Sequence, residues 1–441
     1  MSTLEAASPS LALDAGDIAA LLREAGLPAD AGFEELSSKS MGFSGARIVE
    51  LQLNADGRRL ILKTTTRSVA PEARAAEAAA NSKAHRTDFS YANEIAFLGA
   101  HAAALSDAGG AHRCAIPRPL LARAAAGGAG FILLMDSMGG DEWEQHMLLP
   151  EAGGATEAAL SWLARFHAAF MPPVAGGAGR AGGAAAGMWE VGTHLELSKR
   201  PAAELAALPG TLELFVSCGF GEEDPFFAGL GAAGARRLGE RVRDAAPDVA
   251  RRLREAADTT VHGDFKQANI FFETAAAAGA AGRAGCPRVC VIDWQWTGPG
   301  CAATDVAYMC GIALPDAAVE DYEARVLRPY HGALLAALAE QHAQAAQAAQ
   351  ASPPPPPPPP PPYEQLLLQF KLASIDWFRW LGCARLKGFT PESMRKLAGS
   401  GDLNRGQYCK STGRLVWLWQ RAAEFMDELY PERSEIADGS D

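Results

Sequence analysis

Two aspartates and one asparagine have types and a spacing that could do chemistry on phosphate. Asp264 is followed five residues later by Asn269, and Asp293 ends the apolar run Val289 to Ile292. Transfer of a phosphoryl group from ATP needs one group that orients a hydroxyl and two oxygen ligands for magnesium. We therefore predict that Asp264 accepts the proton of the attacking hydroxyl and that Asn269 and Asp293 bind Mg²⁺.

The segments around these residues should bring them together. Lys266 lies two residues after Asp264, so in a short extended loop its ammonium can face the same cleft and meet the γ-phosphate. Ile270 to Phe272 and Val289 to Ile292 predict two short buried strands of one hairpin, which would place both expected metal ligands at one end. The alternative is that these polar residues only cap a turn and end a strand in a fold without activity.

The motif His-Gly-Asp-x-x-x-x-Asn at 262–269, followed by Ile-Asp-Trp at 292–294, resembles the aminoglycoside phosphotransferase and choline-kinase-like families. Within them it is most similar to the ecdysteroid-kinase-like branch. These families are relatives of the protein kinases. The resemblance implies a bilobal protein-kinase-like fold of the α+β class, with an antiparallel sheet plus a helix in the N-terminal lobe. It also implies a mostly helical C-terminal lobe and ATP between the lobes. The segment Ala275 to Gly285 departs from the compact hairpin expected here, and we interpret it as an excursion from the hairpin tip.

The N-terminal lobe should bind the nucleotide. Arg47 to Leu53 alternates apolar and polar residues, and a turn at Asn54 to Gly57 leads into a strand that ends near Lys63. Before it stands Gly-Phe-Ser-Gly, whose backbone could approach phosphates closely at Gly42, Ser44 and Gly45. Ordinary hairpins carry the same residues, so this motif alone is weak.

Lys63 ends the third strand, where a kinase-like fold presents a lysine to the α- and β-phosphates. Glu94, on a predicted helix, is its expected ion-pair partner, and the alternative is that both are ordinary surface charges. A later apolar strand leads to the predicted hinge, where backbone amides around Met135 to Met138, including those of Met135 and Ser137, would bind adenine.

The acceptor is predicted to be the hydroxyl of a small molecule. A protein kinase needs a long activation segment after its metal-binding aspartate, whereas this chain re-enters helix near Thr304 and has no Ala-Pro-Glu. Asp305 could cap that helix or hydrogen-bond to the His262 loop, and the cap is the simpler interpretation. His167, in a helix predicted over 155–170, is expected to be a satisfied core histidine.

An unbroken run of prolines, Pro353 to Pro362, follows a Gln/Ala-rich segment. In polyproline II it would extend about 30 Å and could not lie inside a core. We favour a spacer, and the alternative is a ligand for an SH3, WW or profilin groove. The expected divisions are a tail and helix at 1–32, the N-lobe at 33–136, the C-lobe at 137–340, the insert at 341–362, C-terminal helices at 363–430 and a tail at 431–441.

Composition narrows the class further. The 441 residues carry a formal net charge of −12, which argues against a nucleic-acid partner. The eight cysteines form no CxxC pair and suggest reduced thiols. No apolar stretch of membrane length or targeting segment is evident, so a cytoplasmic location without membrane contact is expected. The remaining alternative function is a catalytically inactive kinase-like module that recruits partners through its prolines.

Overall fold

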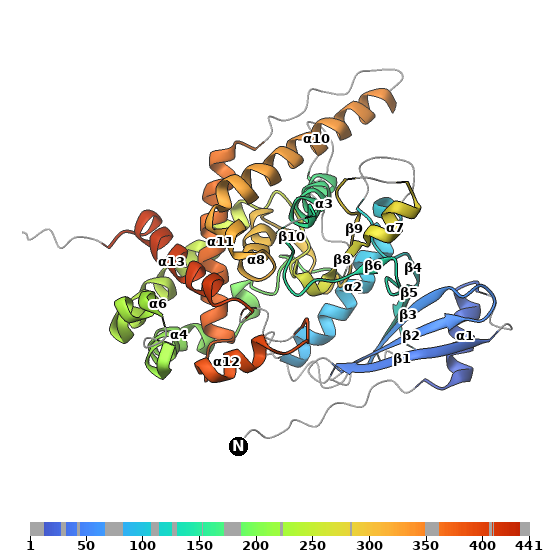
Figure 1. Ribbon diagram of the computed structural model, residues 1–441, viewed down its shortest axis with the longest axis horizontal. Coiled ribbons are helices and arrows are strands. Elements are labelled where there is room, and N and C mark those ends of the chain that lie inside the picture. Colours follow the sequence, from blue (N-terminus) through green and yellow to red (C-terminus); the bar gives the residue numbers. More distant parts are fainter. Residues whose placement is uncertain are drawn as a thin grey trace, which may run out of the picture.

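The computed structural model describes residues 13–27, 32–41, 45–66, 83–106, 114–125, 130–151, 153–171, 187–220, 224–282, 285–348, 361–404, 408 and 410–432. Figure 1 shows a sheet-bearing lobe, which holds β1 to β5, beside a larger lobe that is mostly helical. The predicted α+β class with an antiparallel N-terminal sheet and a helical C-terminal lobe is therefore confirmed. Gly42, Ser44 and the prolines at 353–360 lie outside the described residues.

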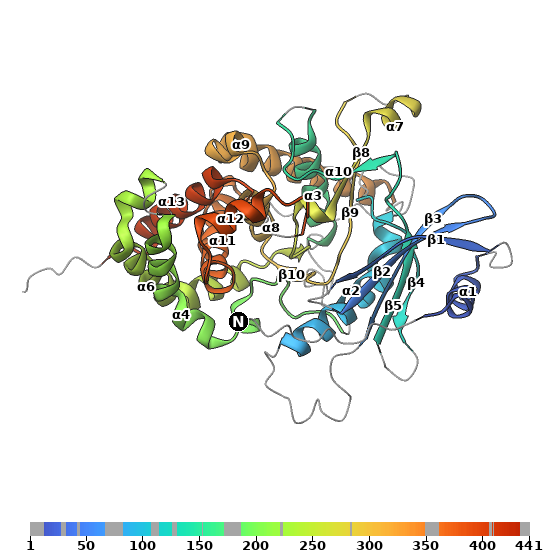
Figure 2. The same cartoon turned by 60° about the horizontal axis from the view of Figure 1, so that its bottom comes forward.

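The N-terminal lobe is built on one antiparallel sheet. Its strands, in spatial order, are β1 (Phe33–Met41), β2 (Ala46–Leu53), β3 (Arg59–Thr66), β5 (Gly130–Asp136) and β4 (Pro119–Ala124). Because neighbouring side chains on a strand point to opposite faces, the sheet has two distinct surfaces. Figure 2 shows α1 (Ala15–Glu24) on one of them and α2 (Lys83–Ser106) on the other.

This alternation decides which residues reach the active cleft. Leu60 and Leu62 of β3 are buried in the small core under α1, with Ile18 and Leu22. Lys63, one residue further along, therefore faces α2 instead. The short amphipathic helix predicted near the N-terminus thus stabilises the sheet from the side opposite the cleft.

The C-terminal lobe consists of packed helices with two small sheets. Its longer helices are α3 (Ala155–Phe170), α4 (Ala202–Phe215), α6 (Pro225–Glu255), α8 (Ala303–Ile312), α10 (Arg328–Ala348), α11 (Tyr363–Ala384) and α13 (Thr412–Leu429). Short helices are α7 (Ala275–Ala280), α9 (Asp316–Glu320) and α12 (Pro391–Ala398), with 3-10 turns at Leu197–Lys199 and Gln267–Asn269 and π-helical turns at Val216–Phe220 and Glu323–Leu327. One small sheet pairs β7 (Thr259–Val261) with β10 (Gly298–Gly300). In the other, β8 (Ile270–Glu273) lies between β6 (Trp143–Glu144) and β9 (Val289–Val291) and pairs with both.

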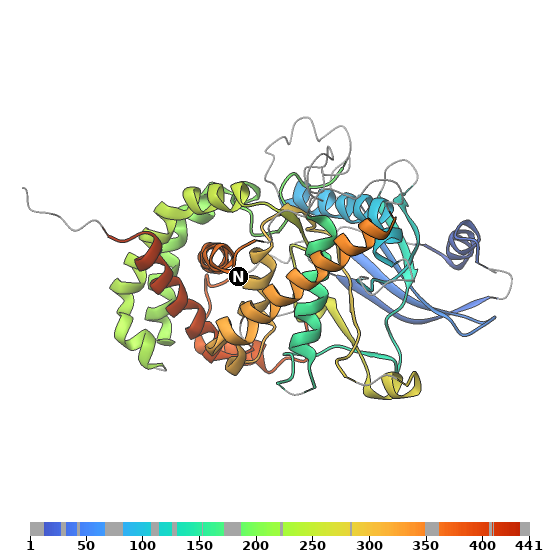
Figure 3. The ribbon, with the colours of Figure 1, turned by 90° about the horizontal axis from the view of Figure 1, so that it is seen from above.

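Helix α11 lies at the centre of this lobe and packs against α4, α6, α8 and α13. Figure 3 shows it almost end-on, with these helices around it. Its approach to α8 requires a glycine, because a Cβ at Gly311 would lie 1.8 Å from Nε1 of Trp377. The fit places Trp377 and Trp380 of α11 close to the catalytic loop described below.

Three prolines, Pro209, Pro225 and Pro247, predict helix breaks within the region 203–258, but two of these breaks do not occur. Pro209 lies inside α4 and Pro247 inside α6, and only Pro225 marks a helix start. The bend in α6 is instead at Gly231, with φ 64° and ψ 167°. A proline ring is compatible with helical φ, so tertiary packing can retain it at the cost of one hydrogen bond and some strain.

One described helical stretch, Ala202–Phe220, is long and apolar enough to cross a membrane by length and composition alone. This differs from the sequence analysis, which predicts no apolar stretch of membrane length. The indication is weak, because core helices pass the same test, and here Leu208, Leu212 and Phe215 belong to the main hydrophobic core.

Candidate active site

The catalytic loop connects β7 to β8. After Val261 it runs through His262, Gly263 and Asp264 into the 3-10 turn Gln267–Asn269, so the loop is held at both ends by buried strands. The carboxylate of Asp264 accepts three hydrogen bonds: from Lys266 Nζ at 2.6 Å, from Tyr308 Oη at 3.0 Å and from Asn269 Nδ2 at 3.3 Å. Lys266 therefore does face the same cleft as Asp264, as its spacing predicted.

Asp264 is buried yet stays ionised. Burial alone would raise the pKa of its carboxyl, but the charge and the hydrogen bond of Lys266, together with other neighbouring groups, hold the pKa below its usual value. The same surroundings raise the pKa of Tyr308 far above its usual value, first through burial and then through the charge of Asp264. At neutral pH the site thus contains a fixed carboxylate and a phenol that acts only as a donor.

The β8–β9 hairpin brings the expected metal ligands to one end. Ile270 pairs with Val291, and the amide of Ile292 donates to the carbonyl of Asn269 at 3.0 Å. The intervening segment folds as α7 at the hairpin tip and leaves both strands intact. The predicted register is therefore confirmed.

The side chains of this pair suit a hydrated, phosphate-bound Mg²⁺. Asn269 uses its Nδ2 amide as a donor, at 2.9 Å to the carbonyl of Asp264, which leaves its oxygen as a ligand. Asp293 has φ 73°, a left-handed conformation uncommon for a residue other than glycine, and its buried Oδ1 has no hydrogen-bond partner among the described residues. Within the described ranges no cluster of three His, Cys, Asp or Glu could hold a metal, and such a two-ligand site fits Mg²⁺ that arrives with phosphates.

Lys63 and Glu94 form a buried ion pair, with Lys63 Nζ 2.7 Å from Glu94 Oε2. A second carboxylate oxygen, Asp293 Oδ1, lies 3.5 Å from the same ammonium. Burial by itself would lower the pKa of Lys63, but Glu94 and Asp293 together raise it, so the lysine remains charged. Asn93, the neighbour of Glu94, donates to the carbonyls of Trp294 and Thr297 at 2.9 and 3.0 Å and fixes α2 to the segment after Asp293.

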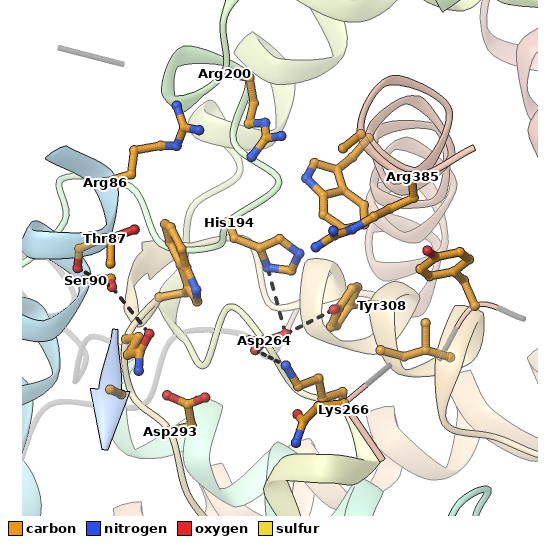
Figure 4. Close-up of a pocket in the computed structure, with 18 of the residues that line it drawn as sticks. Arg86, Thr87, Ser90, His194, Arg200, Asp264, Lys266, Asp293, Tyr308 and Arg385 are labelled. Atoms are coloured by element: carbon orange, nitrogen blue, oxygen red, sulfur yellow. Dashed lines mark hydrogen bonds and ion pairs between the residues drawn. The ribbon is translucent and has the colours of Figure 1, made fainter. Parts of the chain in front are cut away.

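These residues surround one cleft of about 670 Å³ between the lobes. Lys63 and Asp293 line it, and so do Asp264 and Lys266. Figure 4 shows Asp264 near its centre, with Lys266 and Tyr308 joined to it. Residues of the C-terminal lobe that line the remainder include His194, Trp296, Trp377, Trp380, Arg385, Asn404 and Tyr408.

Residues 44–340 match the sequence profile of the phosphotransferase enzyme family, APH. The chain belongs to this family. The match includes the catalytic loop and the hairpin and confirms the resemblance seen in the sequence. A comparison with curated protein sequences finds no match.

Several solved structures are similar to this phosphotransferase over most of its length. A spectinomycin phosphotransferase in complex with ADP and spectinomycin is 9% identical, with a TM-score of 0.44 over 93% of this chain and 98% of that chain. A microcompartment-associated aminopropanol kinase is 13% identical, with a TM-score of 0.43 over 94% and 98%. A Plasmodium vivax ethanolamine kinase is 11% identical, with a TM-score of 0.36 over 89% of this chain and 82% of that chain. At these values the likenesses carry no argument about the substrate.

The hinge of this phosphotransferase differs from the expectation in one respect. The amide of Ser137 donates to the carbonyl of Arg59 at 3.0 Å, and its hydroxyl donates to Glu50 at 3.0 Å. Neither Met135 nor Ser137 lines the cleft, and Gly45 does not either. The amide of Met138 donates no hydrogen bond within the described residues, which leaves it as the available donor of the predicted hinge.

Asp305 supports the catalytic loop from beneath. Its carboxylate accepts hydrogen bonds from the amides of His262 at 2.7 Å and Gly263 at 2.9 Å. It also lies 3.2 Å from Nε2 of His167, whose Nδ1 is 2.7 Å from Tyr330 Oη. The helix-cap interpretation of Asp305 is therefore wrong, because α8 has no side-chain cap and the loop amides offer stronger partners in the interior. His167 is the satisfied core histidine that was predicted.

Replacement of Asp305 by asparagine should lower the free energy of unfolding by about 2 to 4 kcal/mol. The side-chain NH₂ of asparagine would face the backbone N–H of His262 or Gly263, and that backbone donor would then have no acceptor. Urea unfolding at pH 7, followed by tryptophan fluorescence, measures the change. Asp321→Asn, at an exposed position, serves as the control and should shift stability by less than about 0.5 kcal/mol. Equal stability of the two variants would contradict this role.

Gly263 allows a second loop to reach the catalytic aspartate. Its φ is +80°, and a Cβ there would lie 2.2 Å from the carbonyl oxygen of Trp296 and 2.7 Å from the amide nitrogen of Thr193. The loop that carries Thr193 is held by Lys199, whose Nζ donates to the carbonyls of Val191 at 2.5 Å and Thr193 at 2.8 Å. The result is that the next residue of the loop lies beside Asp264.

That residue, His194, was missed in the sequence. Its Nδ1 donates to the carbonyl of Gly263 at 3.0 Å and lies 4.0 Å from Asp264 Oδ1. Burial lowers the pKa of its imidazole to about 4, so it is neutral at pH 7 and keeps Nε2 as an acceptor. A single histidine in an irregular loop belongs to no sequence motif that would predict its role. It lines the cleft only because its loop packs against the distant loop of Gly263.

The buried His194 should make the protein sensitive to acid. Its folded pKa of about 4 lies below its ordinary 6.5, so between these values the unfolded state binds more protons and acid favours unfolding. His194 should therefore cost about 3 kcal/mol of stability as the pH falls from 6.5 to 4. Urea titrations across this range should show a steeper loss for wild type than for His194→Asn, which retains an N–H toward Gly263. Parallel curves would contradict the assignment.

Proposed function

We propose that this phosphotransferase is an ATP-dependent kinase that transfers the γ-phosphoryl group to a hydroxyl of a small molecule. The observation that carries the proposal is that Asp264 and Asp293 line one cleft together with Lys63. A base, a metal-binding carboxylate and a phosphate-binding cation are the parts that such a transfer requires.

Each residue has a defined part in the proposed step. Asp264 accepts the proton of the acceptor hydroxyl. At the same time the hydroxyl oxygen forms a bond to the γ-phosphorus, and the bond between the γ-phosphorus and the bridging oxygen of the β-phosphate breaks, which releases ADP. Lys63, oriented by Glu94, binds the α- and β-phosphates, and Lys266 lies where the transferred group passes. Asn269 and Asp293 would hold Mg²⁺, which neutralises charge on the phosphates when it is bound.

The form of the cleft favours a small acceptor. After Asp293 the chain enters α8 at Ala303, so no long segment is present there to bind a peptide. Aromatic residues of α11 line the side opposite the nucleotide, and they leave a space suited to a small molecule. The same complete set of residues argues against the inactive-module alternative. A cytoplasmic location and a proline-binding partner remain proposals from the sequence.

The proposal is tested by ADP formation from Mg-ATP across a library of small hydroxyl compounds, with a peptide library in parallel. We expect turnover with one class of small acceptors and none with peptides. A thermal shift on addition of Mg-ADP provides a readout that needs no acceptor. Absence of both ADP formation and the thermal shift would refute the proposed function, and phosphate on peptides alone would make the protein a protein kinase.

A further inference from the structure

Three arginines from three separate elements converge on the acceptor end of the cleft. Arg86 lies in the first turns of α2, Arg200 follows the 3-10 turn Leu197–Lys199, and Arg385 follows the last residue of α11. All three line the cleft. In Figure 4 they lie on the side of Asp264 away from Asp293, which is the side where the acceptor must enter.

The acidic residues of the cleft pair with Arg200 but not with Arg385. Of the three acidic lining residues, Asp264 and Asp293 pair with Lys266 and Lys63. The third, Glu204, forms a bidentate pair with Arg200, with N–O distances of 2.8 and 3.0 Å. The charge of Arg385 therefore remains at the acceptor end, although the whole chain carries a formal net charge of −12.

Arg385 is the guanidinium best placed to bind a ligand. Its Cζ lies 5.0 Å from the ring centre of Trp380, and within the described residues its side chain makes no hydrogen bond or ion pair. The stacking orients the planar fork and leaves its N–H groups available. Nε1 of Trp380 is itself a buried donor without a hydrogen-bond partner among the described residues, so this side of the cleft has a second donor that is not used within the protein.

A cationic acceptor fits this end poorly. Aromatic rings can bind an ammonium group, and Trp380, Tyr308 and Trp296 line the cleft. Arg385 already occupies the cation position at Trp380, and the neighbouring arginines would repel a second cation. Arg86 shows the effect of this crowding, because burial and then the charge of Arg200 lower the pKa of its guanidinium. An anion between the arginines would relieve the repulsion.

We infer that the acceptor is a hydroxy compound that carries a carboxylate or another anionic group, bound by Arg385 at the mouth of the aromatic side of the cleft. The inference rests on the proposed kinase function and adds the charge class of its substrate. It also accounts for the arginines, since an anionic acceptor must approach the anionic triphosphate and needs nearby cations to offset their repulsion.

The experiment compares acceptors that share a carbon skeleton and differ in one group. Each hydroxy acid is compared with its neutral carboxamide and with the corresponding amine. Wild type should favour the acids by at least about 10-fold in kcat/KM. Arg385→Gln should lower kcat/KM for the acids by about 10- to 100-fold and leave the KM for ATP unchanged, whereas Arg385→Lys should retain part of the preference. Arg251→Gln, an exposed arginine of α6, is the control and should behave as wild type.

A binding measurement separates the two levels of the proposal. With Mg-ADP present, the acids should raise the melting temperature further and the amines should not. Turnover or binding of amines or amides in preference to acids would overturn the inference and leave the kinase function standing. Binding of Mg-ADP without any effect of an acid would also overturn it. Absence of Mg-ADP binding and of ADP formation would instead refute the proposed function.

Discussion

Replacement of Asp264 by asparagine should lower kcat by about 10²- to 10⁴-fold, the range by which a positioned general base accelerates proton transfer. The amide retains the size of the carboxylate but cannot accept the hydroxyl proton. It also removes the negative charge that Lys266 contacts at 2.6 Å. Initial rates of ADP formation at saturating Mg-ATP measure the loss.

Nucleotide binding provides the control for this variant. Asp264 lies on the acceptor side of the phosphates, so the thermal shift with Mg-ADP should persist in Asp264→Asn. Asp141→Asn, at an exposed aspartate outside the cleft, should retain wild-type rates. A turnover of Asp264→Asn within about 10-fold of wild type would exclude Asp264 as the base.

The parts of this site that can be predicted from the sequence are those whose positions depend on a short run of neighbouring residues. Apolar runs on both sides of Asn269 and Asp293 are enough to predict the hairpin, because strand pairing places the ends of both runs together. Alternation along β3 likewise predicts that Lys63 faces away from the core under α1. In each case the position of a polar residue depends only on its neighbours in the chain.

The residues that could not be predicted depend on contacts between distant segments. His194 reaches the cleft because Gly263 lets its loop approach, and Arg385 does so because α11 packs on α8 at Gly311. Asp305 looked like a cap in its own helix, yet the loop amides it binds are more than forty residues earlier in the chain. The prolines inside α4 and α6 show the same limit, since packing overrides local preference there.

This division has a consequence for specificity. In the proposed function, the residues that would act on the phosphates lie in short motifs, whereas those that would meet the acceptor come from α2, the loop before α4, and α11. Changes of substrate within such a fold can therefore proceed in the second group without disturbing the first. The arginines of the acceptor end belong to this second group.

Replacement of Asp293 by asparagine should weaken the apparent affinity for Mg²⁺ by about 10- to 100-fold and lower kcat/KM for Mg-ATP by about 10³-fold. Asp293 combines a left-handed φ of 73° with a buried Oδ1 that has no hydrogen-bond partner, so its carboxylate is held in position by strained backbone. Asparagine tolerates this φ and removes only the charge. The measurements are ADP formation against Mg²⁺ concentration and the Mg²⁺ dependence of the thermal shift with ADP.

Asp293→Ala distinguishes the loss of charge from the backbone strain. Alanine is disfavoured at a left-handed φ by about 1 to 2 kcal/mol, so this variant should also unfold more easily than Asp293→Asn. Both should require about 10- to 100-fold more Mg²⁺ than wild type, because both lack the carboxylate that would bind the ion. If the asparagine variant retained wild-type Mg²⁺ dependence, the ligand would have to be another residue. The proposal that Asn269 and Asp293 bind Mg²⁺ together across the hairpin would then be wrong.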